Sequence, residues 1–160
     1  MRQRLTARVL LFDPDDRILL IKGRLPGAQQ VAPSWFTVGG GAEPGETARE
    51  AAAREIVEET GITAFELGPT IWRRDGPLPL AGGELVMFLE HYIVARCGGG
   101  VLSRDGWDAV ERALIDDLRW WSLDELRACP DLVHPIGLAD LLPDIIARKY
   151  PEIPREIGWA

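Results

Sequence analysis

Short apolar stretches separated by turn residues occupy the first quarter of the chain and are typical of strands. Residues 5–13 (LTARVLLFD) and 17–23 (RILLIKG) are apolar and contain β-branched side chains. The Pro-Asp-Asp between them predicts a turn within residues 13–16, so the two stretches are expected to form a hairpin. A loop rich in glycine and proline follows at residues 23–34, and "WFTVGGG" at 35–41 predicts a short third strand.

Residues 47–60 change to the composition of a helix. Thr47 followed by Glu50 predicts a capping box at its start, and Gly61 is a suitable residue for its end. The four alanines inside the segment favour the helical backbone. Further along, strands are predicted at residues 62–74, 83–97 and 118–121, with a loop at 75–83, and helices are predicted after Ser122 and within residues 136–150. This mixture predicts one α/β or α+β domain over residues 1–160.

Composition narrows the choice of partners. The formal net charge is -7, so the chain as a whole does not attract nucleic acid backbones, and we expect no nucleic acid polymer as a partner. Cys97 and Cys129 fit neither a zinc spacing nor a disulfide framework, and a cytoplasmic location is therefore expected. The apolar run before Asp13 is too short for a signal peptide or a membrane span, so no membrane partner is expected.

The glutamates of the predicted helix are its most unusual feature. Because residues three and four apart share a helix face, Glu55, Glu58 and Glu59 project from one side within about one turn. Ala53 and Val57 are expected on the opposite side, which can be buried. The acidic side lies in the C-terminal half, where the helix dipole disfavours negative charge. A bound cation would compensate this charge, and carboxylate oxygens are preferred ligands of Mg²⁺ and Mn²⁺.

The stretch from Gly40 to Ile62 resembles the Nudix box, GX5EX7REUXEEXGU, where U is aliphatic. Glycine, glutamate, arginine and the three clustered glutamates all stand at the required offsets, and the two aliphatic positions are isoleucines. The resemblance implies a mixed β-sheet sandwiched between helices, with the box as a loop-helix-loop. It also implies hydrolysis of a nucleoside diphosphate linked to another moiety, with a small nucleotide as the substrate.

The resemblance assigns a role to each matching residue. The positions that match the family's metal ligands are Glu55, Glu58 and Glu59, joined by the backbone carbonyl of Gly39. Glu46 matches a supporting glutamate near the metal, and Arg54 matches the arginine that orients the ligands by ion pairing. The general base varies in the family, and Glu59 and Glu111 are both candidates. The weaker candidates for this role are Asp108, Asp116 and Asp117.

Contacts to the substrate are predicted from residue type alone. Nucleobases stack well on aromatic faces, and Trp35 and Trp107 are the tryptophans with the most loop-like neighbours. Core packing is the commoner role of tryptophan. Arg24 and Arg73 are candidates for phosphate contacts, since arginine binds phosphate through two hydrogen bonds. Ordinary surface positions are the alternative for both arginines.

Three functional hypotheses remain open at the level of sequence. The first is a Mg²⁺- or Mn²⁺-dependent pyrophosphohydrolase of nucleotide-type diphosphates, such as ADP-ribose or nucleotide sugars. The second is a hydrolase of nucleoside triphosphates that clears oxidised nucleotides. The third is a non-catalytic nucleotide sensor, although such proteins commonly have a degraded box. The sequence determines neither the substrate nor the number of ions, and a homodimer is among the assemblies that the resemblance allows.

Overall fold

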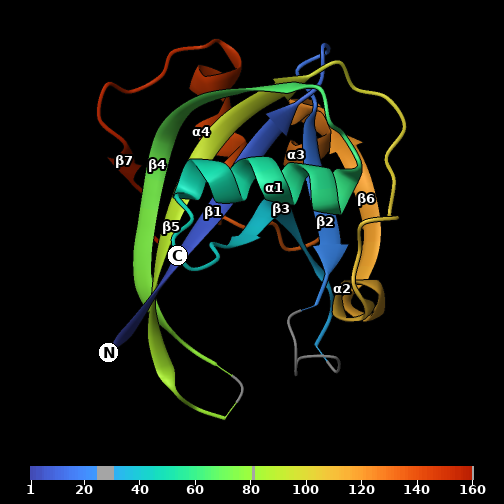
Figure 1. Ribbon diagram of the computed structural model, residues 1–160. Coiled ribbons are helices and arrows are strands. Elements are labelled where there is room, and N and C mark those ends of the chain that lie inside the picture. The colour runs from blue at the N-terminus through green and yellow to red at the C-terminus, as the bar shows by residue number, and fades with distance from the viewer. Residues whose placement is uncertain (25–30, 81, 160) are drawn as a thin grey trace.

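The computed structural model describes residues 1–24, 31–80 and 82–159. In this part of the chain, seven strands form one mixed sheet in the order β6-β2-β3-β1-β5-β4-β7, with helices on both of its faces (Figure 1). The elements are β1 (Arg2–Phe12), β2 (Ile18–Gly23), β3 (Ser34–Gly41), α1 (Ala48–Thr60), β4 (Phe65–Pro79), β5 (Leu85–Cys97), α2 (Ala109–Leu114), β6 (Ile115–Trp121), α3 (Leu123–Arg127), α4 (Leu138–Ile146) and β7 (Arg155–Glu156). The predicted fold class, a mixed sheet between helices, is confirmed.

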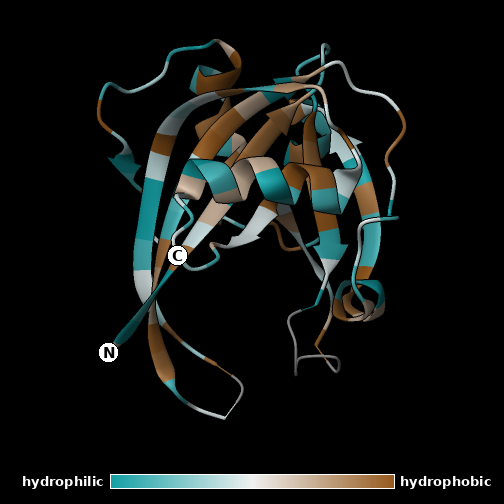
Figure 2. Cartoon of the chain, in the orientation of Figure 1, coloured by the Kyte–Doolittle hydropathy of each residue, from teal (hydrophilic) through white to brown (hydrophobic). Residues whose placement is uncertain are grey.

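The core has two halves, one on each face of the sheet. Side chains alternate along β1, so Val9 and Leu11 pack beneath α1, whereas Leu10 and Phe12 pack towards α3 and α4. Figure 2 shows hydrophobic residues concentrated in the strands behind α1. A strand buried on both faces has a nearly continuous apolar sequence, as the end of β1 does. None of the helices in the described ranges is long and apolar enough to cross a membrane.

The β4–β5 hairpin is longer than its sequence indicates. A loop was predicted at residues 75–83, but β4 continues to Pro79 and pairs with β5 as far as Leu85. Pro77 and Pro79 cannot donate a backbone hydrogen bond to a neighbouring strand. They are accommodated because β7 pairs with β4 only at Trp72 and Arg73, so beyond that point the described part of β4 has a partner on one side.

The buried side of α1 also differs from the prediction. Val57 is 41% exposed and Ala53 is only half-buried. The residues of α1 that are buried are Ala48, Ala51, Ala52, Ile56, Glu59 and Thr60. The small alanines let the helix lie close to the strands beneath it, so the alanine side faces the sheet and carries Glu59 into the interior. Glu59 and Glu55 therefore lie where the helix meets β3, beside Gly39 and Gly40.

Candidate active site

Helix α1 carries the clustered glutamates, and local hydrogen bonds hold both of its ends. The Thr47 hydroxyl accepts the N–H of Glu50 at 3.1 Å, and the Glu50 carboxylate accepts the N–H of Thr47 at 3.2 Å. Gly61 ends the helix in the left-handed conformation, with φ of 76°, and its N–H donates to the Val57 carbonyl. The predicted start and end of the helix are thus present. The glutamates between them have the regular helical spacing, which places Glu55, Glu58 and Glu59 on one side.

Arg54 is the ionic centre of this helix. Its Nε and Nη2 bind Glu46 at 2.9 Å and 2.8 Å, and these hydrogen bonds lower the pKa of Glu46 to about 2. Its Nη1 lies 3.1 Å from Glu55 Oε1 and 3.2 Å from Glu58 Oε2. Nη2 also donates to the Gly41 carbonyl at 3.1 Å. A guanidinium can do this because its five N–H donors lie in one plane and point in different directions.

Glu59 and Glu55 form the buried part of the acidic cluster. Glu59 is 4% exposed, and its Oε1 accepts the N–H of Gly39 at 2.8 Å. Burial raises the pKa of Glu59 well above its usual value, and the nearby charge of Glu55 adds to the rise. Burial likewise raises the pKa of Glu55, and the nearby charge of Glu58 adds to the rise. For both acids, burial is the largest cause of the rise, because it disfavours the charged form of a carboxyl group.

Glu111 approaches this cluster from a separate helix. It lies in the first turn of α2, where its N–H donates to Asp108 Oδ1 at 2.8 Å and its Oε1 accepts the N–H of Asp108 at 3.2 Å. Partial burial raises the pKa of Glu111, and the charges of Asp108 and Glu58 contribute to the rise. The charge of Glu111 in turn contributes to the raised pKa of Glu59. Acids that are far apart in the sequence therefore influence one another's pKa.

The family of the chain follows from a comparison with known protein families. The NUDIX domain family model matches residues 2–144, which include the glutamate helix and the strands around it. The chain belongs to the Nudix hydrolase family. An RNA pyrophosphohydrolase of Caulobacter vibrioides is 33% identical over an alignment of 144 residues, and the match covers 79% of this chain and 74% of that protein.

One further relative matches a short segment of the sequence, and one solved structure matches most of the fold. A putative 8-oxo-dGTP diphosphatase of Bacillus subtilis is 43% identical over 58 residues, but these are 36% of this chain and only 35% of that protein's length. The crystal structure of a MutT NUDIX hydrolase from Burkholderia pseudomallei superposes with a TM-score of 0.57 at 27% identity, over 87% of this chain and 96% of that one. The shared features thus extend from the sequence to the fold.

Nudix hydrolases generally need divalent metal ions, and the glutamates of α1 fit such an ion in their chemistry. They offer several carboxylate oxygens, which are the ligands that hard divalent cations prefer. Within the described ranges, however, no three His, Cys, Asp or Glu side chains already converge closely enough to hold an ion. Glu58 is turned to Arg54, and one oxygen of Glu59 is turned to the Gly39 N–H. The contact seen for Gly39 uses its N–H, and the ligand role of its carbonyl remains a prediction.

The two tryptophans considered as base platforms are both buried in this Nudix fold. Trp35 is 3% exposed, packs edge-on against Trp121 with ring centroids 4.9 Å apart, and donates from Nε1 to Asp131. Trp107 is 6% exposed and donates from Nε1 to the Glu59 carbonyl. Neither ring presents an open face to a nucleobase. Their burial supports packing roles, which the sequence also allowed, over stacking.

The two arginines considered for phosphate contacts have acidic partners of their own. Arg24 Nη1 lies 3.0 Å from Asp116 Oδ2, and Arg73 Nη2 lies 3.3 Å from Asp75 Oδ2. In the described part of the chain, neither arginine forms an ion pair with a glutamate of α1. Their contacts with a substrate remain predictions. Because the Asp116 carboxylate accepts this hydrogen bond from Arg24, Asp116 is a weaker candidate for the general base.

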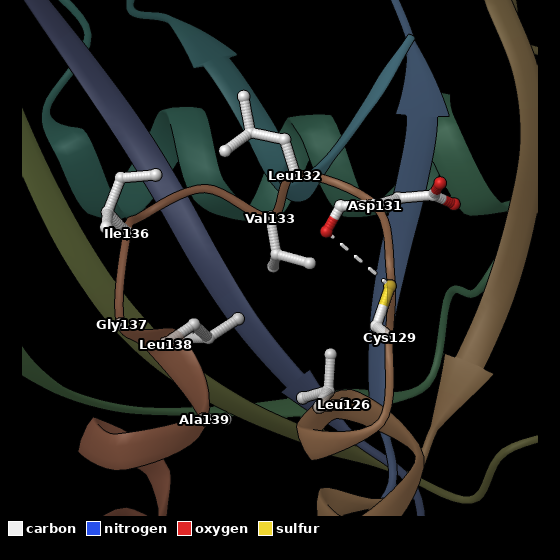
Figure 3. A pocket seen from close by; sticks show the side chains of 9 residues that line it. All are labelled: Leu126, Cys129, Asp131, Leu132, Val133, Ile136, Gly137, Leu138 and Ala139. Carbon is white, nitrogen blue, oxygen red and sulfur yellow. Dashed lines mark hydrogen bonds between the residues drawn. The ribbon is translucent and has the colours of Figure 1, made fainter.

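A cavity on the other face of the sheet was missed by sequence reasoning. It has a volume of about 250 Å³ and lies between α3, α4 and the loop that joins them (Figure 3). The residues that line it are Leu126, Cys129, Asp131, Leu132, Val133, Ile136, Gly137, Leu138 and Ala139. The loop carries no motif, so no signal in the sequence marked it. Sequence analysis also missed Arg8 of β1, which belongs to no motif. Its positive charge opposes the rise in the pKa of Glu59.

Proposed function

We propose that this Nudix protein hydrolyses a diphosphate linkage in a nucleoside diphosphate joined to another moiety, such as ADP-ribose or a nucleotide sugar, with Mg²⁺ or Mn²⁺. The observation that carries the proposal is that Arg54 holds two carboxylates of α1, Glu55 and Glu58, beside each other. A purely structural helix would place positive charge at this end, because its dipole favours cations there. The complete box and the hydrolase relatives support an enzyme over a non-catalytic sensor.

The proposed hydrolysis requires both neutralisation of the phosphate charge and transfer of a proton from the attacking water. When bound, a divalent cation supplies neutralisation of phosphate charge and a lowered pKa of water. Glu55, Glu58 and Glu59 would hold it, together with the carbonyl of Gly39. Arg54 keeps the first two carboxylates on one side of the helix, and the Gly39 N–H fixes one oxygen of Glu59. These contacts limit the rotation of the side chains before a substrate arrives.

Proton transfer requires a carboxylate within reach of the attacking water. The charge of Glu58 contributes to the raised pKa of Glu111, which supports Glu111 as an acid near the cluster, and a pKa raised towards neutral pH suits a general base. Glu59 is the alternative base, but it is almost completely buried and bonded to the Gly39 N–H. We therefore favour Glu111 in this role, with Glu59 as a metal ligand.

A second candidate function rests on one of the relatives. The Bacillus subtilis relative is named a putative 8-oxo-dGTP diphosphatase, and its similarity is 43% over 58 residues. A nucleoside triphosphate is therefore the alternative substrate class. Phosphorus NMR of the products distinguishes the two classes, because only a triphosphate substrate releases pyrophosphate.

The test is a hydrolysis screen with Mg²⁺ and Mn²⁺, followed by one pair of variants. The screen covers nucleoside triphosphates, ADP-ribose, dinucleoside polyphosphates, nucleotide sugars and dinucleotide cofactors. Glu58→Gln keeps the size of the side chain and removes its charge, and kcat should fall about 100-fold or more on every active substrate. Glu66→Gln changes an exposed glutamate of β4 and should leave kcat unchanged. Unchanged metal-dependent hydrolysis by Glu58→Gln would sink the proposal.

A further inference from the structure

A segment distant in the sequence supplies hydrogen-bond donors to the end of α1. The last four carbonyls of a helix have no partner within it. The Ser103 N–H donates to the Thr60 carbonyl at 2.8 Å, and Trp107 Nε1 donates to the Glu59 carbonyl at 2.8 Å. The chain after β5 therefore passes the C-terminal end of α1 before it reaches α2 (Figure 1).

This segment packs on α1 without a gap. Gly106 lies so close to the helix that a Cβ there would be 2.6 Å from the Glu58 carbonyl oxygen. Trp107 is held from its other sides as well: Arg112 Nε donates to its carbonyl at 3.3 Å, and the Arg104 guanidinium lies 4.9 Å from its ring centroid. The indole is therefore locked between the glutamate helix and the start of α2.

The Trp107 indole lies between α1 and the start of α2, the two helices that carry the acidic side chains. Asp108, the N-cap of α2, directly follows Trp107, and Glu111 lies in the next turn. We propose that Trp107 is a positioning residue, whose N–H acts through the Glu59 carbonyl to set the spacing between Glu111 and the carboxylates of Glu58 and Glu59. The inference rests on the proposed function, because this spacing is the one on which ion binding and proton transfer would depend. It goes beyond a packing role, in which any ring of similar size would suffice.

A matched pair of variants separates positioning from packing. Trp107→Phe keeps an aromatic ring and removes the N–H. Trp121→Phe does the same at another buried tryptophan, 4% exposed, whose Nε1 has no hydrogen-bond partner within the described residues. Groups that orient metal ligands typically change metal affinity or activity about 10–100-fold. The Mn²⁺ dissociation constant, measured by electron paramagnetic resonance on the full chain, should thus rise about tenfold in Trp107→Phe, and kcat should fall similarly, with KM changing about threefold or less.

The control variant and a second variant of the segment show which results would overturn the inference. Trp121→Phe should leave both constants within about twofold of wild type, and Trp107→Phe behaving like Trp121→Phe would overturn the inference. Wild type that neither binds Mn²⁺ nor hydrolyses any substrate would overturn the proposed function and this inference together. If Trp107→Phe is poorly folded, Gly106→Ala displaces the same segment from Glu58 and should raise the Mn²⁺ dissociation constant. An unchanged constant in that variant also counts against positioning.

Discussion

Arg54 and Glu46 are joined by two parallel hydrogen bonds, Nε to Oε2 at 2.9 Å and Nη2 to Oε1 at 2.8 Å. Glu46 lies in the loop before α1, so the pair ties that loop to the middle of the helix. This arrangement leaves Nη1 of Arg54 to bind Glu55 and Glu58 on its other edge. One arginine therefore orients a structural acid and two predicted metal ligands at the same time.

The Arg54–Glu46 pair predicts a pH dependence of stability. The pKa of Glu46 is lowered from 4.5 to about 2 in the folded protein, mainly by the hydrogen bonds from Arg54. The carboxylate thus stabilises the fold above about pH 4.5, and this contribution is lost as the pH falls through 4.5 towards 2. The difference in Tm between wild type and Glu46→Gln should be largest near neutral pH and shrink on acidification. Thermal melts across this range check the sign, and a difference that grows in acid contradicts it.

Glu111→Gln tests the assignment of the general base. Glutamine preserves the capping box of α2, because its side-chain oxygen also accepts the N–H of the N-cap residue Asp108. The variant should keep its Tm and its Mn²⁺ affinity while kcat falls about 10²–10⁴-fold, the usual contribution of a general base. Single-turnover rates and Mn²⁺ titrations provide the measurements. A change in kcat of about threefold or less would transfer the role to Glu59.

Gly39→Ala should be strongly destabilising. Gly39 has φ of 142°, a conformation that residues with a Cβ rarely adopt, and a Cβ there would overlap the carbonyl oxygen of Ala7 in β1. Backbone strain and overpacking of 1–3 kcal/mol each predict a loss of roughly 3 kcal/mol in the free energy of unfolding. Urea denaturation measures it. Gly98→Ala is the control, since a Cβ at Gly98 meets no atom within 4 Å and should leave stability nearly unchanged.

Trp159 predicts an effect on stability without an effect on catalysis. Its ring lies 3.8 Å from the Arg74 guanidinium, and its Nε1 donates to the Asp75 carbonyl at 3.0 Å. Trp159→Ala should therefore cost about 1–2 kcal/mol through the lost cation–π contact and hydrogen bond. Calorimetry and steady-state kinetics check both halves of the prediction. Ile153→Ala, at a residue that is 81% exposed, should change neither quantity.

Elements whose hydrogen bonds close within a few residues were the ones that sequence reasoning predicted well. The Asp13 carboxylate accepts the N–H of Asp15 and of Arg17 at 3.0 Å and 2.9 Å, which forms the turn expected between the first two strands. Ser122 and Glu125 form a capping box at the start of α3, where a helix was expected after Ser122. In each case the donor and acceptor are neighbours in the chain, so no knowledge of the rest of the fold is required.

Features that depend on a distant surface were predicted less well. Val57 was expected to be buried but is exposed, because the alanine side of α1 is the side that fits against the sheet. The end of β4 was expected to be a loop, yet β5 supplies hydrogen-bond partners there. Trp35 and Trp107 have loop-like neighbours in the sequence, but distant residues help to bury them: Trp121 packs against Trp35, and the Glu59 carbonyl accepts the Trp107 N–H.

The sequence by itself determined the ends of α1, the helical spacing of Glu55, Glu58 and Glu59, and the Nudix box that they share with Arg54. Only the tertiary structure decided that the charge of Glu111 acts on Glu59, that the Gly39 N–H binds Glu59, and that the Trp107 indole donates to the end of the helix. The physical reason is the range of the forces involved. Helical spacing follows from backbone geometry within one turn, whereas a shared site requires segments far apart in the chain to be brought together by burial of the core.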